Sequence, residues 1–266
     1  MSLHLKKKHN LTVLNPDKKN KTIIFANGFG TDQSAWDRVA PAFESDYRII
    51  KFDNVGAGKS DPELYSPNKY DNLFSYADDL IDLCKEAEVH DAVMVGHSVS
   101  GMIGTLAAIR QPELFSKLVL VGASPRYLND DDYVGGFDQE ALNSLYQAMA
   151  TNYFAWVSGF ATVVMANTDR PYLAESFART LSTIRPDIAQ SVAKVIFQSD
   201  HRSDIGKLGR PTLLLQTKHD VAVPIEVAQF LNENIKNSVL HIVDAEGHFP
   251  HISAAENVIF EIQNFL

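Results

Sequence analysis

Short apolar runs recur along the chain, and they are rich in branched side chains. They span residues 22–26, 48–52, 92–95, 118–121, 212–216 and 239–243. Nearly continuous apolar runs of this length are typical of strands buried on both faces, as in a parallel sheet. The pattern therefore predicts a mostly parallel central sheet.

Between these runs, apolar positions follow the period of a helix. The clearest stripe consists of Leu73, Tyr76, Ala77, Leu80, Ile81 and Cys84. Steps of three and four residues place these side chains on one face, so we expect a helix packed on the sheet. Cys84 belongs to the stripe and is predicted to be a core residue, not a nucleophile.

The alternation of strand and helix stops after 118–121 and resumes at 212. Residues from about 138 to 199 show helical periodicity, with Pro171 and Pro186 as interruptions. A helical insertion between consecutive strands of a sheet is a candidate lid. We therefore predict an α/β fold whose core (1–126 and 206–266) is interrupted by a helical lid (127–205).

Composition narrows the class of protein. The 266 residues include 24 Lys and Arg against 33 Asp and Glu, a net charge of −9 that argues against nucleic-acid binding. The single cysteine excludes a disulfide scaffold and a Cys-rich metal site, and it fits a reducing cytoplasm. No apolar run approaches the roughly 18 to 20 residues of a membrane span. We expect a cytoplasmic protein that binds neither membrane nor nucleic acid.

Lysines are concentrated near the N-terminus, at 6–8 and within 18–21. They flank a short apolar stretch, which predicts the solvated ends of an N-terminal hairpin, with an acidic partner as the alternative. Residues 9–12 (HNLT) follow the first cluster, where a secretory signal would need an apolar segment of roughly 7 to 15 residues.

The segment 96–101 (GHSVSG) lies between the run ending at Val95 and a helical pattern. In a nucleophile elbow, a serine occupies a sharp turn between strand and helix, and small residues two before and two after it allow close approach. Ser98 has this position, with Gly96 before it and Ser100 in place of the usual glycine after it. The context predicts that Ser98 is a nucleophile.

A nucleophilic serine needs a base, and the base needs an orienting carboxylate. Asp220 and His248 each follow one of the last two apolar runs, in the chain order serine, acid, histidine. Both therefore lie beyond the carboxyl end of a strand, where open α/β sheets bind ligands. Ser98, Asp220 and His248 form the predicted catalytic triad. His251 is the alternative base, and His97 is predicted to belong to the pocket wall or the scaffold.

Acyl transfer also needs two backbone donors for the developing oxyanion. One is the amide of Val99, directly after the predicted nucleophile. The other is expected in the segment 27–30 (NGFG), where glycines on both sides of Phe29 let its N–H point inward while its ring faces the pocket. A glycine-rich turn without a donor role is the alternative.

The sequence implies no cofactor and no metal. The segment 53–60 ends in Gly-Lys-Ser, but Asp53 stands where a phosphate-binding loop requires glycine. No Gly-x-Gly-x-x-Gly pattern follows a strand, and no group of His, Asp and Glu has the spacing of metal ligands.

At several of these positions the chain resembles the α/β-hydrolase superfamily. It is most similar to the group that contains the bacterial stress regulator RsbQ and the plant strigolactone and karrikin receptors. The similarity lies in 28–36 (GFGTDQSAW), 96–100 (GHSVS), 110–129, 135–137 (GGF) and 246–251 (EGHFPH). Ser100 matches the plant receptors, whereas Asn27 stands where many hydrolases carry histidine.

The resemblance implies the α/β-hydrolase fold with a four-helix lid over the site. It also implies the same triad and an oxyanion hole formed by Phe29 and Val99. The resemblance further implies a pocket lined by Phe29, Phe137, Trp156, Phe160 and Phe197. His97 is a further expected pocket residue, because it precedes Ser98 directly in the sequence. For the lid aromatics, ordinary contacts between helices are the alternative.

Two functions are compatible with one such site. The first is a carboxylesterase-like serine hydrolase that cleaves an uncharged, fairly apolar small ester or lactone. The second is a ligand-binding regulator with slow or single-turnover hydrolysis that acts through a protein partner. The resemblance to RsbQ implies stress signalling and a phosphatase-like partner. Lyases and cofactor-free haloperoxidases share the serine triad, whereas Ser98 excludes relatives with an aspartate nucleophile.

Overall fold

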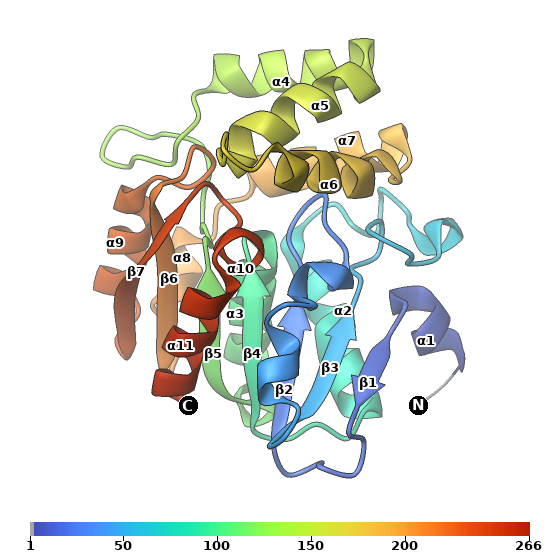
Figure 1. The fold of residues 1–266 in the computed structure, drawn as a ribbon, viewed down its shortest axis with the longest axis vertical. Coiled ribbons are helices and arrows are strands. Elements are labelled where there is room, and N and C mark those ends of the chain that lie inside the picture. The colour runs from blue at the N-terminus through green and yellow to red at the C-terminus, as the bar shows by residue number, and fades with distance from the viewer. Residues whose placement is uncertain (1–2) are drawn as a thin grey trace.

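Seven strands form one central sheet in the computed structural model, which describes residues 3–266 (Figure 1). The strands are β1 (Thr12–Leu14), β2 (Thr22–Ala26), β3 (Arg48–Phe52), β4 (Ala92–His97), β5 (Phe115–Val121), β6 (Thr212–His219) and β7 (Ser238–Glu246). Their order across the sheet is β1-β3-β2-β4-β5-β6-β7, and all neighbours are parallel except β1 and β3. The prediction of a mostly parallel sheet is confirmed.

Side chains of the strands alternate between two cores, one on each face of the sheet. In β2, Ile24 packs in the core that contains residues of α2 (Leu73–Glu86) and α3 (Val99–Arg110), whereas Ile23 and Phe25 pack with α11 (Ala255–Phe265). Burial of both faces explains why the apolar runs are nearly continuous. Strands β4 to β7 are longer than their apolar runs, because the backbone pairing of the sheet continues into neighbouring residues, several of which are polar.

Helices connect the strands and cover both faces of the sheet (Figure 1). Besides α2, α3 and α11, they are α1 (Leu3–His9), α4 (Gln139–Thr151), α5 (Tyr153–Met165), α6 (Pro171–Ser182), α7 (Pro186–Gln198), α8 (Arg202–Ile205), α9 (Ile225–Asn234) and α10 (Pro250–Ser253). Short 3-10 turns are η1 (Gln33–Trp36), η2 (Ala40–Phe43), η3 (Pro62–Leu64) and η4 (Pro112–Leu114). No helix within residues 3–266 combines the length and the apolar character needed to cross a bilayer.

Helix α2 carries the predicted apolar stripe. It begins after Asn72, whose side-chain oxygen accepts hydrogen bonds from the amides of Phe74 and Ser75. Cys84 is fully buried in this helix, and burial raises the pKa of its thiol. Cys84 is therefore a core residue, as predicted.

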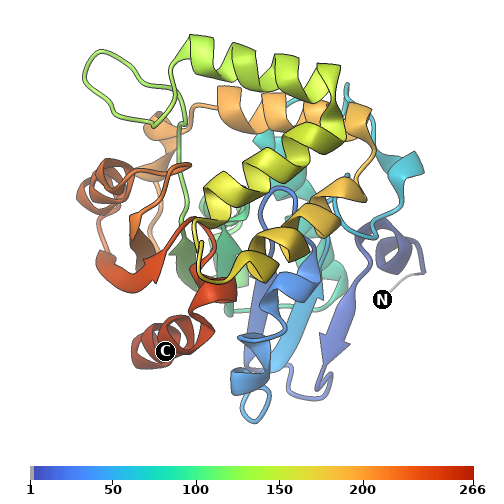
Figure 2. The same cartoon turned by 45° about the horizontal axis from the view of Figure 1, so that its top comes forward.

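Four helices, α4 to α7, lie between β5 and β6 in the chain and above the carboxyl ends of the strands (Figures 1 and 2). Helix α5 packs along α6, and α4 packs against α5 and α7. These helices occupy the segment in which the sequence predicts a helical insertion. The domain boundaries at residues 126 and 205 stay a prediction.

The predicted N-terminal hairpin is wrong. Residues 6–8 lie in α1, and β1 pairs with β3 instead of with the following strand, β2. Both edges of β2 are occupied, by β3 and β4, so β1 takes the outer edge of β3. Lys8 does not end in solvent, because its ammonium group donates to the buried carboxylate of Asp79 at 2.6 Å.

We expect the contact between α2 and the core to be a main source of stability. Leu80 of α2 is only 1% exposed, so Leu80→Ala should lower the free energy of unfolding by about 2–5 kcal/mol. Phe260→Ala is the control, because Phe260 on α11 is 61% exposed and should change that free energy by less than about 0.5 kcal/mol. Urea denaturation measures both, and equal losses would contradict the assignment of Leu80 to the core.

Candidate active site

Ser98 lies on a strained turn between β4 and α3. Its backbone angles are φ 54° and ψ −126°, which a non-glycine residue adopts only at an energetic cost. Its amide donates to the carbonyl of Val121 at 2.8 Å, which fixes the turn to the end of β5. This conformation is the sharp elbow that the sequence predicts.

Close contacts on both sides of the elbow leave room only for glycine. A Cβ on Gly96 would lie 2.5 Å from the carbonyl oxygen of Ser100, and one on Gly101 would lie 2.7 Å from Cβ of Ala123. Position 100 itself tolerates a hydroxyl group. Ser100 Oγ donates to the carbonyl of Asn27 and accepts from Asn54 Nδ2 at 2.9 Å, so it links the elbow to the loop 27–30.

A continuous chain of hydrogen bonds joins the three residues of the predicted triad. His248 Nδ1 lies 2.7 Å from Asp220 Oδ2, and His248 Nε2 lies 2.9 Å from Ser98 Oγ. The other carboxylate oxygen of Asp220 accepts from the amides of Ala222 and Val223. Because a carboxylate only accepts, neutral His248 carries its proton on Nδ1, and Nε2 is free to accept from Ser98.

The loop that carries His248 touches the inserted helices. Gly247 has φ 81°, and a Cβ there would lie 2.3 Å from the carbonyl oxygen of Met165. The amide of His248 donates to the carbonyl of Val164 at 2.8 Å. Both partners belong to the last turn of α5, so the position of the imidazole depends on that helix.

The two predicted backbone donors belong to the loop 27–30 and to the start of α3, and their role stays a prediction. Val99 is the first residue of α3, where amides have no acceptor within the helix. Asn27, which replaces the histidine of many hydrolases, donates from Nδ2 to the carbonyl of Thr31 at 2.6 Å. A Cβ on Gly28 would lie 2.4 Å from His97 Nδ1, so only glycine fits this approach to the elbow.

Two further histidines lie behind the triad. His97 and His251 are fully buried with ring centroids 4.4 Å apart, and burial lowers the pKa of both, that of His251 to about 3. His97 Nε2 donates to the carbonyl of His248 at 2.8 Å, which makes His97 part of the scaffold. His251 stacks on Trp36, and within the described residues neither of its ring nitrogens has a hydrogen-bond partner. His248, and not the alternative His251, therefore contacts Ser98.

The predicted pocket residues divide into two groups. Phe29 lines an apolar cavity of about 30 Å³ beside the loop 27–30. Trp156 stacks on Phe160 with ring centroids 4.9 Å apart, and Phe137 meets Phe197 edge to face at 5.4 Å. The four rings thus form two separate pairs, and their place in a substrate pocket stays a prediction.

Tyr127 is a site residue that the sequence analysis missed. Its hydroxyl lies 3.2 Å from Ser98 Oγ, and it is the donor in this contact if the serine proton points to His248. Burial raises the pKa of Tyr127, so the hydroxyl stays protonated. Tyr127 lies within the stretch 110–129 that carries the family resemblance, but no spacing rule connects it to the serine.

Within residues 3–266, no group of three or more His, Cys, Asp and Glu side chains is placed to hold a metal ion. A serine hydroxyl bonded to an imidazole that a buried carboxylate orients can attack a carbonyl carbon.

Comparison with known proteins agrees with this geometry. A family model described as the alpha/beta hydrolase fold matches residues 21–255. The chain belongs to the α/β-hydrolase fold family. Because the match spans β2 to β7 and the inserted helices, it confirms both the predicted fold and the prediction of an α/β-fold hydrolase.

Individual relatives are similar over almost the whole length. The hydrolase is 44% identical over 252 residues to the karrikin insensitive 2 receptor CA of Petunia hybrida, covering 94% of this chain and 93% of that one. It is 44% identical to a strigolactone esterase of Pisum sativum, with 92% of each chain covered. A solved hydrolase from Oleispira antarctica superposes with a TM-score of 0.94 at 32% identity, covering 98% of this chain and 95% of that one. The predicted resemblance to the plant receptors is confirmed, and that to RsbQ stays a prediction.

The buried histidines of the hydrolase should make its stability depend on pH. Burial lowers the pKa of His9, His97 and His251 in the folded protein. Histidines of the unfolded chain have a pKa of about 6.5, so as the pH drops below this value the unfolded chain binds more protons than the folded protein does. The free energy of unfolding should therefore fall as the pH drops from 6.5 toward 5.

His251→Phe should make this decline shallower by up to about 1.4 kcal/mol per pH unit, because one of the three groups is removed. Urea denaturation at pH 7.5, 6.5, 5.8 and 5.2 measures the slope. His219→Gln is the control, since His219 is 76% exposed in its side chain. Identical slopes in wild type and His251→Phe would contradict a neutral, buried His251.

Proposed function

We propose that the protein is a serine hydrolase that cleaves an uncharged small-molecule ester or lactone through an acyl-enzyme on Ser98. The observation that carries the proposal is the hydrogen-bond chain from Asp220 through His248 to Ser98, with contacts of 2.7 and 2.9 Å. All three side chains are buried, so no water competes strongly for these bonds.

In the proposed reaction, Ser98 Oγ attacks the carbonyl carbon while its proton moves to His248 Nε2. Asp220 accepts from Nδ1–H, holds the imidazole in place and stabilises the imidazolium that forms. His248 then gives the proton to the departing alkoxide oxygen. Water attacks the acyl-enzyme with His248 again as the base, and Ser98 is regenerated.

The negative charge that develops on the carbonyl oxygen needs fixed donors. We assign this role to the amides of Phe29 and Val99, which come from the loop 27–30 and from the first residue of α3. The bond from Asn27 to Thr31 and the contact of Gly28 with His97 hold that loop in place before substrate arrives. The hole is therefore preorganised.

The surroundings of the site favour an apolar substrate. The rings of Phe29, Phe177 and Phe249 are among the side chains around it, and the chain carries a net charge of −9. An apolar wall and an acidic protein both disfavour a polyanion. We propose no cofactor for this reaction.

A regulatory role is the second candidate, and one contact supports it. The amide of His248 bonds to Val164 in α5, so a ligand or acyl group that displaces the imidazole also acts on the inserted helices. Several relatives are named receptors. We propose that occupancy of the site shifts these helices between states with different affinity for a cytoplasmic, phosphatase-like partner, which requires a ligand that distinguishes the two states.

Ser98→Ala and His248→Ala should each lower kcat for p-nitrophenyl acetate by about 10⁴-fold or more, because members of a triad act as a unit. The double variant should lose little beyond either single one. Thermal unfolding of each variant provides the control for folding. Near-normal turnover by a folded Ser98→Ala protein would contradict the proposed nucleophile.

The time course of p-nitrophenol release separates the two candidate functions. Sustained release over many equivalents, dependent on Ser98, is expected for a metabolic esterase. A burst of about one equivalent followed by slow release is expected for a regulator that retains its acyl group. Intact mass of the protein, sampled during the assay, should show the acyl group on the wild type and not on Ser98→Ala.

A further inference from the structure

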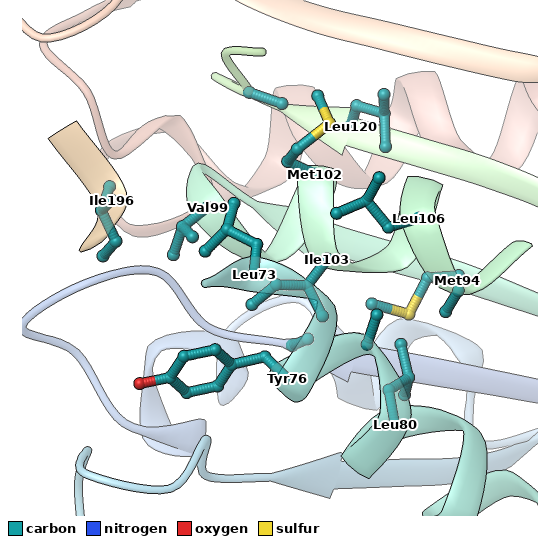
Figure 3. Packing of buried hydrophobic residues seen from close by; sticks show 14 of the residues in the cluster. Leu73, Tyr76, Leu80, Met94, Val99, Met102, Ile103, Leu106, Leu120 and Ile196 are labelled. Carbon is teal, nitrogen blue, oxygen red and sulfur yellow. The ribbon is translucent and has the colours of Figure 1, made fainter. Parts of the chain in front are cut away.

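The two proposed amide donors of the oxyanion hole are held in different ways. Val99 begins α3, and its side chain is 5% exposed and packs in one buried cluster with Leu73 and Ile103 (Figure 3). Close packing of this kind fixes the start of the helix, and with it the direction of the Val99 amide. Phe29, in contrast, lies between two glycines and is only partly buried, so packing alone does not set the direction of its amide.

Residues 28–31 form a tight turn that contains the amide of Phe29. The amide of Thr31 donates to the carbonyl of Gly28 at 3.3 Å, and Gly30 has φ 79°. This bond, with a positive φ at the third residue, is typical of a type II turn, whose first carbonyl points into the turn. The N–H of Phe29 shares a trans peptide unit with that carbonyl and points the opposite way, out of the turn.

Thr31 holds the carbonyl of Gly28 a second time, through its side chain. The hydroxyl donates to that oxygen at 2.9 Å, an ordinary length for such a bond, whereas the backbone contact at 3.3 Å is long. Thr31 is 3% exposed, so water competes little for the bond of its hydroxyl. Asn27 Nδ2 donates to the carbonyl of Thr31 at 2.6 Å and ties Thr31 to the residue before the turn.

The turn lies against the predicted nucleophile. A Cβ on Gly28 would lie 3.0 Å from Cβ of Ser98, so no side chain separates the turn from the elbow. The amide of Phe29 donates to no acceptor within residues 3–266. This amide is therefore available to the carbonyl oxygen of an ester that Ser98 attacks.

We propose that Thr31 is a positioning residue of the oxyanion hole: its hydroxyl holds the carbonyl of Gly28 and thereby sets the direction in which the amide of Phe29 donates. This inference rests on the proposed hydrolase function. Without the hydroxyl, the long backbone bond is the main restraint on the peptide between Gly28 and Phe29, and glycine permits that peptide to rotate. The loss should appear in the transition state, where the oxyanion is present, and not in the binding of substrate.

Thr31→Val tests the inference, because valine has nearly the shape of threonine but donates no hydrogen bond. We expect kcat/KM for p-nitrophenyl acetate to fall about 10- to 100-fold, somewhat less than the loss that removal of a whole oxyanion donor causes. Thr31→Ser keeps the hydroxyl and should retain kcat/KM within about threefold of wild type, which is a change below about 0.7 kcal/mol.

Two inhibitors separate stabilisation of the oxyanion from binding of substrate. With ethyl trifluoromethyl ketone, Ser98 Oγ adds to the carbonyl carbon, the serine proton moves to His248 Nε2, and the carbonyl oxygen becomes an oxyanion. The Ki of this ketone should rise in Thr31→Val by the factor by which kcat/KM falls. p-Nitroacetanilide, the amide analogue of the ester, binds without forming the oxyanion, and its Ki should change by less than about twofold.

Thr212→Val is the matched control. The hydroxyl of Thr212 also donates to a backbone carbonyl, that of Arg210, at 2.9 Å, and Thr212 is fully buried. Thr212 is the first residue of β6, at the end of the strand opposite to the site. Both valine variants lose a bond of the same length, so thermal unfolding should show similar falls in Tm. Only Thr31→Val should change kcat/KM.

The outcomes separate this inference from the proposed function. Unchanged kcat/KM in Thr31→Val, with hydrolysis that still depends on Ser98, overturns the role of Thr31 and leaves the hydrolase intact. An equal loss in Thr31→Ser, or an equal rise in the Ki of p-nitroacetanilide, also overturns that role. If Thr31→Val does not fold, Thr31→Ala and Thr212→Ala replace the two valine variants in the same assays. Absence of Ser98-dependent hydrolysis by the wild type overturns the proposed function and the inference together.

Discussion

The short hydrogen bonds of His248 to Asp220 and Ser98 are the constraint on which the rest of the structure depends. They require three loops, from β4, β6 and β7, to meet within hydrogen-bond distance although the residues lie as much as 150 positions apart. A parallel sheet meets this requirement because the carboxyl ends of its strands share one edge. The strained backbone of Ser98 then raises its hydroxyl toward the imidazole, and close contacts at Gly96 and Gly101 hold that strain.

The two buried histidines behind His248 are uncharged, and neither of them takes its hydrogen-bond partners Asp220 and Ser98. His97 and His251 lie next to His248, yet burial keeps both uncharged, and His97 uses its one N–H to hold the backbone of His248. A charged imidazole in their place would repel the imidazolium that the proposed mechanism forms on His248. Neutral, packed rings instead give the base a rigid support with a low dielectric constant, in which its bond to Asp220 is stronger than in water.

The inserted helices are connected to the chemistry through the same loop. The bond from His248 to Val164 and the close approach of Gly247 to Met165 join the base to the end of α5. In an enzyme, this connection would fix the position of the imidazole. In a regulator, the same connection would link occupancy of the site to the inserted helices. One contact therefore serves both candidate functions, and the rate at which the acyl group leaves Ser98 distinguishes them.

The sequence by itself determined the sheet and the inserted helices, and it predicted the three residues that the structure joins by hydrogen bonds. Nearly continuous apolar runs of this length are typical of strands buried on two faces, and Ser98, Asp220 and His248 each follow such a run, so local pattern predicted that they share one edge. The tertiary structure decided what local pattern does not encode: that β1 pairs with β3, and that Tyr127 reaches Ser98. These features depend on which edge is free and which side chains meet across distant segments, and packing of the whole chain sets both.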